Sequence, residues 1–192
     1  MLLKELTENV AIKEVLGEEA EVLSLALNTK NVAKDAMFFA LRGEKFDGND
    51  FIDEAIKAGA VAICTERKPK VMVENVCYII VEDAHAACAI ISSNFYGNPS
   101  SKLKLVGITG TNGKTTVASL SAELMRGLGY KVGLISTVGD KVLGEKTVEI
   151  ESGRTTPTTP DSIVINELLY KMVSQGLGSN RLATISYGEE KP

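Results

Sequence analysis

Residues 103–116 read Leu-Lys-Leu-Val-Gly-Ile-Thr-Gly-Thr-Asn-Gly-Lys-Thr-Thr, an apolar run followed by a glycine turn, a lysine and two threonines. The pattern predicts a strand, a tight loop and then the first turn of a helix. A polyphosphate needs such a loop, because its crowded negative charge is met by backbone N–H groups, a helix N-terminus, one lysine and a hydroxyl that holds Mg²⁺. The stretch therefore predicts a phosphate-binding loop for a nucleotide.

The residues of this loop have distinct expected roles. Gly110 and Gly113 let the backbone come close to the phosphates, and Lys114 reaches the outer phosphate groups. The Thr115 hydroxyl is the expected Mg²⁺ ligand. The usual loop has a further glycine five positions before its last one, and here that position is Ile108, so the shorter form Gly-x-x-Gly-Lys-Thr remains. A glycine-rich turn that carries a surface lysine is the alternative interpretation.

The composition is that of a soluble globular protein, with 44% apolar and 24% charged residues among 192. This length allows one large or two small domains. The net charge of -4, with Lys and Arg scattered along the chain, argues against nucleic acid as a partner. The sequence has no apolar stretch long enough to span a membrane, and its charged N-terminal residues are unlike a secretory signal. We therefore expect a cytoplasmic protein that does not insert into membranes.

The cysteines and the histidine have expected structural roles. Cys64, Cys77 and Cys88 lack the spacing of a zinc site and are predicted to be buried, reduced thiols. His85 follows two acidic residues at the start of an alanine-rich helical stretch. A capping or surface role is therefore expected for His85 rather than catalysis.

The first part of the chain, up to about Tyr96, alternates strand-like and helix-like segments, which predicts a small α/β domain. Gly59 follows one helical pattern at the position where glycine commonly ends helices. The predicted helices are 2–15, 50–58 and 84–95, the predicted strands are 22–27, 36–41, 60–65 and 77–81, and a polar loop is predicted over 42–49.

The turn-forming residues 97–101, Gly-Asn-Pro-Ser-Ser, mark the predicted boundary between a domain of residues 1–98 and a second domain of residues 99–192. The second domain begins with a strand, a helix and a strand around the phosphate loop, as a right-handed parallel crossover requires. Its predicted elements are strand 103–109, helix 114–128 ending at Gly129, strand 131–136, a hairpin or loop over 138–146, and helix 162–174 capped by Asp161 or Thr159.

Taken together, these segments resemble the Mur ligase family. The phosphate loop Gly-Ile-Thr-Gly-Thr-Asn-Gly-Lys-Thr-Thr, including its deviation at Ile108, is the family's form. Residues 28–60 are similar to the family's uridine-nucleotide-binding N-terminal domain, although Asn28-Thr29-Lys30 stands where the family usually has Asp-Ser-Arg. Residues 155–161, Thr-Thr-Pro-Thr-Thr-Pro-Asp, resemble the substrate-gripping turn of the tripeptide-forming members, which add the third amino acid of the peptidoglycan stem peptide.

The resemblance implies an α/β fold in which a uridine-nucleotide-binding domain is followed by the first part of a P-loop parallel-sheet domain. It also implies an ATP- and Mg²⁺-dependent ligation. The γ-phosphate passes to a carboxylate of UDP-MurNAc-L-Ala-D-Glu, and the amino group of a diamino acid then displaces it. By this likeness Lys114 is catalytic, Thr115 holds the metal, and Thr29, Thr158 and Thr159 bind the UDP-linked substrate. The implied ATP-binding residues are Gly110, Thr111, Asn112, Gly113, Lys114, Thr115 and Thr116.

The resemblance ends at about Gly176, before the rest of the central domain, its metal-holding modified lysine and the C-terminal domain of a full ligase. We therefore expect that a polypeptide of residues 1–192 does not complete the ligation alone. The full-length protein is expected to be a monomer. A nucleotide- or UDP-sugar-binding module without catalysis stays an alternative, as do other ligases of the family and a structural α/β protein with a fortuitous glycine loop. Residues 28–60 argue against a folylpolyglutamate-type synthetase, and residues 155–161 argue against a dipeptide-adding ligase. The choice of diamino acid is not specified by these residues.

Overall fold

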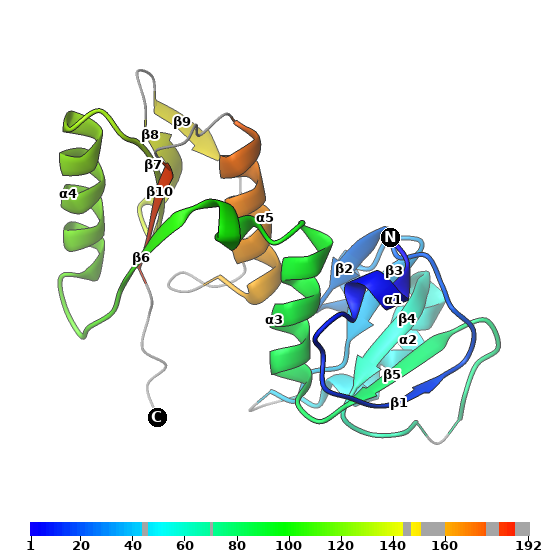
Figure 1. Ribbon diagram of the computed structural model, residues 1–192. Helices are drawn as coiled ribbons and strands as arrows, with labels where there is room; N and C mark the ends of the chain where they lie inside the picture. The colour runs from blue at the N-terminus through cyan, green and yellow to red at the C-terminus, as the bar shows by residue number, and fades with distance from the viewer. Residues whose placement is uncertain (44–45, 70, 144–146, 151–159, 176–180, 187–192) are drawn as a thin grey trace. The chain divides into compact units, whose positions relative to one another are not determined.

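The computed structural model describes all residues except 44–45, 70, 144–146, 151–159, 176–180 and 187–192. The chain forms two compact units, Met1–Phe95 and Tyr96–Pro192, and each unit has its own five-stranded sheet (Figure 1). The division between Phe95 and Tyr96 lies three residues before the predicted boundary at 98/99. Residues 99–102 form a 3₁₀ helix, η3 (Pro99–Lys102), that packs on α5 within the second unit.

The sheet of the first unit has the order β1-β5-β4-β3-β2, and its four neighbouring strands β2 to β5 are parallel. The strands β3, β4 and β5 are almost continuously apolar and buried, as expected for parallel strands with both faces covered. The edge strand β1 pairs antiparallel with β5. The strands are β1 (Ile12–Leu16), β2 (Ser24–Ala26), β3 (Ala36–Phe39), β4 (Ala60–Thr65) and β5 (Cys77–Val81).

Helices cover the two faces of this sheet. The helix α2 (Ile52–Ala58) shares a core cluster with alternate strand residues, including Phe38, Ile63 and Tyr78. The helix α3 (Ala84–Phe95) contacts β4 and the short helix α1 (Leu3–Leu6), and it covers the face opposite to α2 (Figure 1). The predicted strands 60–65 and 77–81 and the predicted helix 84–95 are confirmed to the residue.

The predicted helix over 2–15 is wrong. The helix α1 ends at Thr7, whose Oγ1 donates to the Leu3 carbonyl at 2.9 Å, and Asn9 has a φ of 63° that breaks the helical path. Ile12–Leu16 forms β1 instead. The apolar residues Ile12 and Leu16 are four apart, a spacing that places them on one face of either a helix or a strand, so pairing with β5 decided between them.

The start of another helix in the first unit also differs from prediction. The predicted helix 50–58 is split into a 3₁₀ helix, η2 (Gly48–Phe51), and α2. The Asp47 side chain accepts the Asn49 N–H at the start of η2, which tightens this turn. Gly59 ends α2 in the left-handed conformation, with a φ of 115°, as predicted.

The sheet of the second unit has the order β6-β10-β7-β8-β9. The strand β10 is parallel to both β6 and β7 and lies between them, so the two strands of the predicted crossover are not neighbours. The antiparallel strands β8 and β9 extend the sheet beyond β7. The strands are β6 (Lys104–Ile108), β7 (Lys131–Ser136), β8 (Gly139–Leu143), β9 (Thr147–Ile150) and β10 (Arg181–Ser186).

Two helices cover opposite faces of the second sheet (Figure 1). The helix α4 (Lys114–Gly127) packs on Val132 and Leu134 of β7, and α5 (Ser162–Ser174) packs in a second cluster with Ile135. The predicted helix 162–174 is confirmed, and Asp161 Oδ1 accepts the Val164 N–H at 3.0 Å as its N-cap. The other predicted cap, Thr159, lies outside the described residues.

The strand β6, which leads into the phosphate loop, lies at the edge of the described sheet. Its residues Lys104–Gly107 are exposed, including Leu105 and Val106. Residues 103 and 108 at its two ends are half-buried against the two core clusters. Within the described part of the chain, no helix is long and apolar enough to cross a lipid bilayer.

Candidate nucleotide-binding sites

The loop that follows β6 has the backbone geometry of an anion cradle. Gly110 and Gly113 have φ values of 143° and 76°, in the left-handed region that glycine tolerates. Gly113 is the N-cap of α4, and as a glycine it has no side chain that could accept a hydrogen bond from the first turn of that helix. The N–H groups of this turn and the positive end of the helix dipole are therefore available to a negatively charged ligand.

The two glycines leave open space beside the loop. A Cβ at Gly113 would have no heavy atom within 4 Å, and one at Gly110 would lie 3.8 Å from the Asn112 carbonyl oxygen. Glycine is thus required here by backbone conformation rather than by crowding inside the protein. The open side of the loop gives a polyphosphate direct access to backbone N–H groups.

Lys114 begins α4 and folds back over the loop. Its Nζ donates a hydrogen bond to the Gly110 carbonyl oxygen, so the positive charge is held beside the open glycine backbone. A carbonyl is a neutral acceptor, and a phosphate oxygen is a stronger, charged one. A bound phosphate can therefore replace this carbonyl as the partner of Lys114 by rotation of the side chain.

The Thr115 hydroxyl lies 2.8 Å from the Thr137 hydroxyl. Thr137 directly follows β7, and β7 runs parallel to β6 through their shared neighbour β10. The carboxyl ends of both strands thus bring side chains to the same edge of the sheet, where ligands of parallel α/β sheets bind. Sequence reasoning missed Thr137, although its position directly after a strand of the predicted crossover was a usable signal.

The donors at this loop suit Mg²⁺ bound together with a nucleotide. Mg²⁺ takes oxygen ligands and usually combines one or two protein oxygens with phosphates and water. The Thr115 hydroxyl supplies such an oxygen beside the phosphate-facing backbone. The described residues hold no group of three or more His, Cys, Asp or Glu side chains that could bind a metal by themselves.

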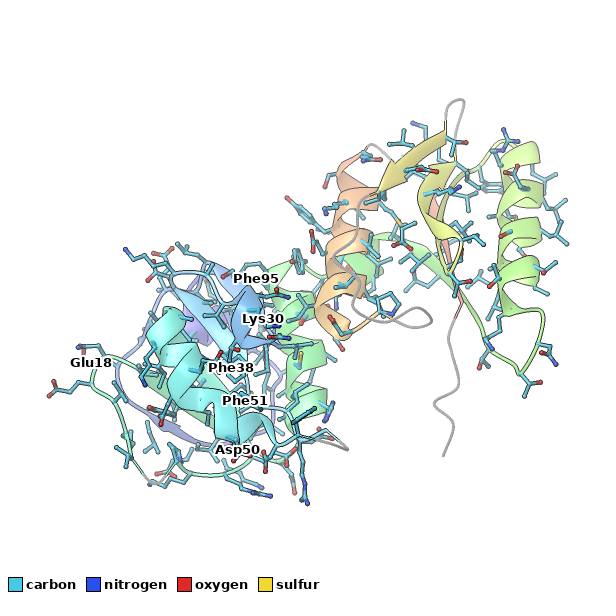
Figure 2. The ribbon with its side chains drawn as sticks, turned by 180° about the vertical axis from the view of Figure 1, so that it is seen from behind. Glu18, Lys30, Phe38, Asp50, Phe51 and Phe95 are labelled. Atoms are coloured by element: carbon cyan, nitrogen blue, oxygen red, sulfur yellow. The ribbon has the colours of Figure 1, made fainter. Side chains whose placement is uncertain are left out.

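The first unit contains a separate cavity of about 740 Å³, within the usual size range of small-molecule sites. It lies beyond the carboxyl ends of β2 and β3 and extends to the first turn of α2. Figure 2 labels Lys30, Phe38 and Phe51, which reach the cavity from three separate segments. The other lining residues are Leu27, Asn28, Thr29, Leu41, Gly43, Phe46, Gly48, Glu54 and His85.

Thr29, the residue predicted to bind the UDP-linked substrate, lines this cavity. Its hydroxyl donates to Glu54 Oε1 at 2.7 Å, which leaves the oxygen lone pairs free to accept from a ligand. Asn28 caps the 3₁₀ helix η1 (Thr29–Asn31) by accepting the Lys30 N–H at 3.0 Å. An aspartate would make the same cap, so the replacement of Asp by Asn28 preserves the local backbone.

A short turn at one side of the cavity is closed by backbone hydrogen bonds. The Gly43 N–H donates to the Phe46 carbonyl at 2.9 Å, and the Gly48 N–H donates to the Leu41 carbonyl at 2.8 Å. These bonds place Phe46, whose side chain is 71% exposed, beside Phe51 in an edge-to-face pair with ring centroids 6.4 Å apart. The ring planes meet at 70°, so each ring separately offers an apolar face or edge to a planar ligand.

Asp47 ties this turn to the end of β4. Its Oδ1 accepts the Asn49 side-chain and backbone N–H groups at 2.6 and 3.0 Å, and its Oδ2 pairs with Arg67 at 3.2 Å. The side-chain hydrogen bond from Asn49 is the largest of the effects that lower the pKa of Asp47, followed by the backbone hydrogen bond. The Thr65 hydroxyl donates to Asn49 Oδ1 at 2.6 Å and connects the network to the sheet.

His85 does not cap α3. Asp83 does so, with Oδ1 accepting the Ala86 N–H at 2.9 Å. The His85 side chain is exposed, lies 3.3 Å from the Arg42 carbonyl oxygen through Nε2, and lines the cavity. The predicted surface position is therefore confirmed, while its place at the cavity, like those of Phe46 and Phe51, was not anticipated because it depends on distant segments meeting.

The other predicted site residues fall into two groups. Thr111, Asn112 and Thr116 are exposed in or directly after the phosphate loop. Thr158 and Thr159 lie outside the described residues. The three cysteines are buried thiols that form no disulfide, as predicted.

Two family models match the chain. The model described as the Mur ligase family catalytic domain matches residues 21–96, and that described as the Mur ligase middle domain matches residues 108–179. The chain belongs to the Mur ligase family. The two matches correspond to the two units, so the cavity and the phosphate loop of this Mur ligase chain each lie within or beside a matched region.

Two curated relatives of this Mur ligase chain are named UDP-N-acetylmuramoyl-L-alanyl-D-glutamate–2,6-diaminopimelate ligase. The protein from Cytophaga hutchinsonii is 44% identical over 178 residues, which are 92% of this chain and 35% of the relative. That from Bacteroides fragilis is 41% identical over 177 residues, with the same coverage. The chain thus spans about a third of the length of the curated relatives it matches.

Solved structures of Mur ligases have the same fold. A structure of a UDP-N-acetylmuramoyl-L-alanyl-D-glutamate–2,6-diaminopimelate ligase matches with a TM-score of 0.61 at 24% identity, over 86% of this chain and 31% of that one. MurF from Acinetobacter baumannii matches with a TM-score of 0.57 at 16% identity, over 97% of this chain and 35% of that one. MurF from Thermotoga maritima, solved in complex with ADP, matches with a TM-score of 0.55 at 24% identity, over 88% of this chain and 33% of that one.

Proposed function

We propose that this chain supplies the nucleotide-binding part of a tripeptide-forming Mur ligase, which joins a diamino acid to UDP-MurNAc-L-Ala-D-Glu with the energy of ATP. The observation that carries this proposal is the identity of 44% and 41% to relatives with that activity in their names, over 92% of the chain. The same names favour 2,6-diaminopimelate as the amino acid. The substrates are water-soluble nucleotides and amino acids, in keeping with the cytoplasmic location expected from the sequence.

In the proposed reaction, a free carboxylate of the UDP-linked dipeptide attacks the γ-phosphorus of ATP, and the bond to the β–γ bridging oxygen breaks to release ADP. The amino group of the diamino acid then attacks the resulting acyl phosphate, and inorganic phosphate leaves as the amide forms. ATP supplies the leaving groups, and the protein supplies position and charge. Lys114 and the N–H groups at the start of α4 would neutralise the phosphate oxygens, and Thr115 would hold Mg²⁺.

The cavity of the first unit is the proposed site of the UDP group. Phe46 and Phe51 would contact the planar uracil ring, and Lys30 would pair with the diphosphate. The lone pairs of the Thr29 hydroxyl would accept a hydrogen bond from the ligand while the hydroxyl continues to donate to Glu54 Oε1. The substrate-binding roles of Thr158 and Thr159 are proposed on the family resemblance alone.

Because the chain spans about a third of its relatives, the first test measures binding rather than turnover. Titration calorimetry with Mg²⁺·ATP and, separately, with UDP is expected to show binding of both. Lys114→Ala should weaken ATP binding about tenfold to a hundredfold, since it removes a charged hydrogen bond worth about 1.5–3 kcal/mol. UDP binding should not change in that variant, because the cavity is in the other unit.

Lys104→Ala is the matched control, since Lys104 is an exposed lysine on β6 outside the loop. It should leave both affinities unchanged. An ATP affinity that does not respond to Lys114→Ala would favour a structural protein with a fortuitous glycine loop. A ligase is separated from a binding module by measuring phosphate release from ATP in the presence of UDP-MurNAc-dipeptide and diaminopimelate. Sustained turnover by residues 1–192 would contradict our expectation that this polypeptide does not complete the ligation alone.

A further inference from the structure

The hydroxyl pair of Thr115 and Thr137 joins two parts of the second unit that the sequence separates by 22 residues. Thr115 is the second residue of α4, at the phosphate loop, and Thr137 is the first residue after β7. The two oxygens lie 2.8 Å apart, a normal distance for an O–H···O hydrogen bond. One of the two hydroxyls therefore donates to the other.

The hairpin between β7 and β8 holds Thr137 in place. Ser136 pairs with Gly139 across the hairpin, so Thr137 and Val138 form a two-residue turn. The Ser136 hydroxyl is buried and donates to the Gly139 carbonyl at 3.3 Å. The exposed Thr137 side chain is not needed for this packing. Its position is thus fixed by the backbone, while its hydroxyl points to Thr115.

Metal binding decides the direction of this hydrogen bond. A threonine hydroxyl has one proton and two lone pairs. When the Thr115 oxygen gives a lone pair to Mg²⁺, its proton must point away from the cation, toward an acceptor. Thr137 Oγ1 is an acceptor at hydrogen-bond distance. The Thr137 proton is then free to donate to water.

We propose that Thr137 is a positioning residue of the magnesium site. Its Oγ1 accepts a hydrogen bond from the Thr115 hydroxyl and so orients the Thr115 lone pair toward the Mg²⁺ of bound ATP. This inference rests on the proposed ATP site. Without Thr137 the Thr115 hydroxyl can rotate, and its lone pair faces the cation for only part of the time. The loss should appear in the contribution of Mg²⁺ to ATP binding and not in the affinity for ATP without metal.

The test compares the ATP affinity with Mg²⁺ and with EDTA in four single-site variants and one double variant of the 192-residue chain. Thr137→Val keeps the shape and removes the hydroxyl. It should reduce the gain in affinity due to Mg²⁺ about twofold to tenfold, the range for one hydrogen bond, and leave the affinity in EDTA unchanged. Thr137→Ser should restore the gain. Thr147→Val changes an exposed threonine of β9 and should have no effect.

The fourth variant is Thr115→Val, alone and combined with Thr137→Val. If Thr137 acts through Thr115, the double variant should lose no more of the Mg²⁺ gain than Thr115→Val loses alone. An unchanged Mg²⁺ gain in Thr137→Val, additive losses in the double variant, or an equal loss in EDTA would each overturn the inference. Failure of the proposed ATP site is recognised separately, because Lys114→Ala would then leave the affinity for Mg²⁺·ATP unchanged.

Discussion

Replacement of Gly48 by alanine should open the turn beside the cavity of the first unit, the proposed UDP site. A Cβ at this position would lie 2.5 Å from the Leu41 carbonyl oxygen and 2.6 Å from the Leu41 nitrogen, whereas ordinary contacts begin at 3.4 Å. Both atoms belong to the backbone, so no side-chain rotation can relieve the contact. The Gly48 N–H bond to the Leu41 carbonyl, now 2.8 Å long, would stretch past the limit of a hydrogen bond.

The expected cost is about 2–4 kcal/mol, from overpacking and from the weakened hydrogen bond. Amide hydrogen exchange of peptides from β3 and β4 measures this cost within the first unit. For amides that exchange through unfolding of that unit, the rates should rise roughly 30-fold to 1000-fold, because each 1.4 kcal/mol is a factor of ten. Affinity for UDP should fall as well, since Gly43, Phe46 and Gly48 line the cavity.

Gly127→Ala is the control. Gly127 is the last residue of α4, and a Cβ there would have no heavy atom within 4 Å. Alanine is the better helix former by up to about 1 kcal/mol, so the stability of the second unit should be unchanged or slightly higher. Unchanged exchange rates in β3 and β4 of Gly48→Ala would refute the reasoning from the close contact.

Two further predictions concern stability. Burial, and to a lesser extent the nearby Cys88 and Glu66, raise the pKa of Cys64 from 9.0 to about 12. Between these two pH values only the unfolded chain loses the thiol proton, so the free energy of unfolding of the first unit should fall above about pH 9, by up to about 1.4 kcal/mol per pH unit. Urea unfolding at pH 8 and pH 10 measures this fall. An equal fall in Cys64→Ala would contradict the prediction. Asp161→Ala should destabilise α5 by about 1 kcal/mol, because the helix loses its N-cap, whereas Asp161→Asn keeps the side-chain acceptor. Urea unfolding of the two variants measures the difference. Equal urea midpoints would show that the cap contributes nothing to stability.

Local sequence signals predicted the elements whose start and stop residues act over a few positions. Gly59 ends α2 through its left-handed backbone, and Asp161 begins α5 through its side chain. The apolar runs of β4 and β5 are buried on both faces, so their bounds follow from hydrophobicity alone. Each of these signals lies within one turn or one strand of the residues it determines.

The errors have a common cause in long-range pairing. Residues 12–16 have a spacing that fits a helix or a strand, and pairing with β5 selected the strand. The strand β10 was not predicted, and its place between β6 and β7 depends on both of them. At the phosphate loop, the motif predicted Lys114 and Thr115 by their own order in the chain. The place of Thr137 directly after a predicted strand was a usable signal, but its contact with Thr115 depends on the sheet that aligns β7 with β6.

The insertion of β10 between β6 and β7 sets the order in which the two units can form during synthesis on the ribosome. All strands of the first sheet have been made once Val81 is added, so this unit can fold while the rest of the chain is still being translated. The second sheet must wait, because Lys104 of β6 pairs with Leu182 of β10. Until β10 has been translated, the nascent phosphate loop has no completed sheet beneath it, and ATP binding should begin only after residues 181–186 have been added.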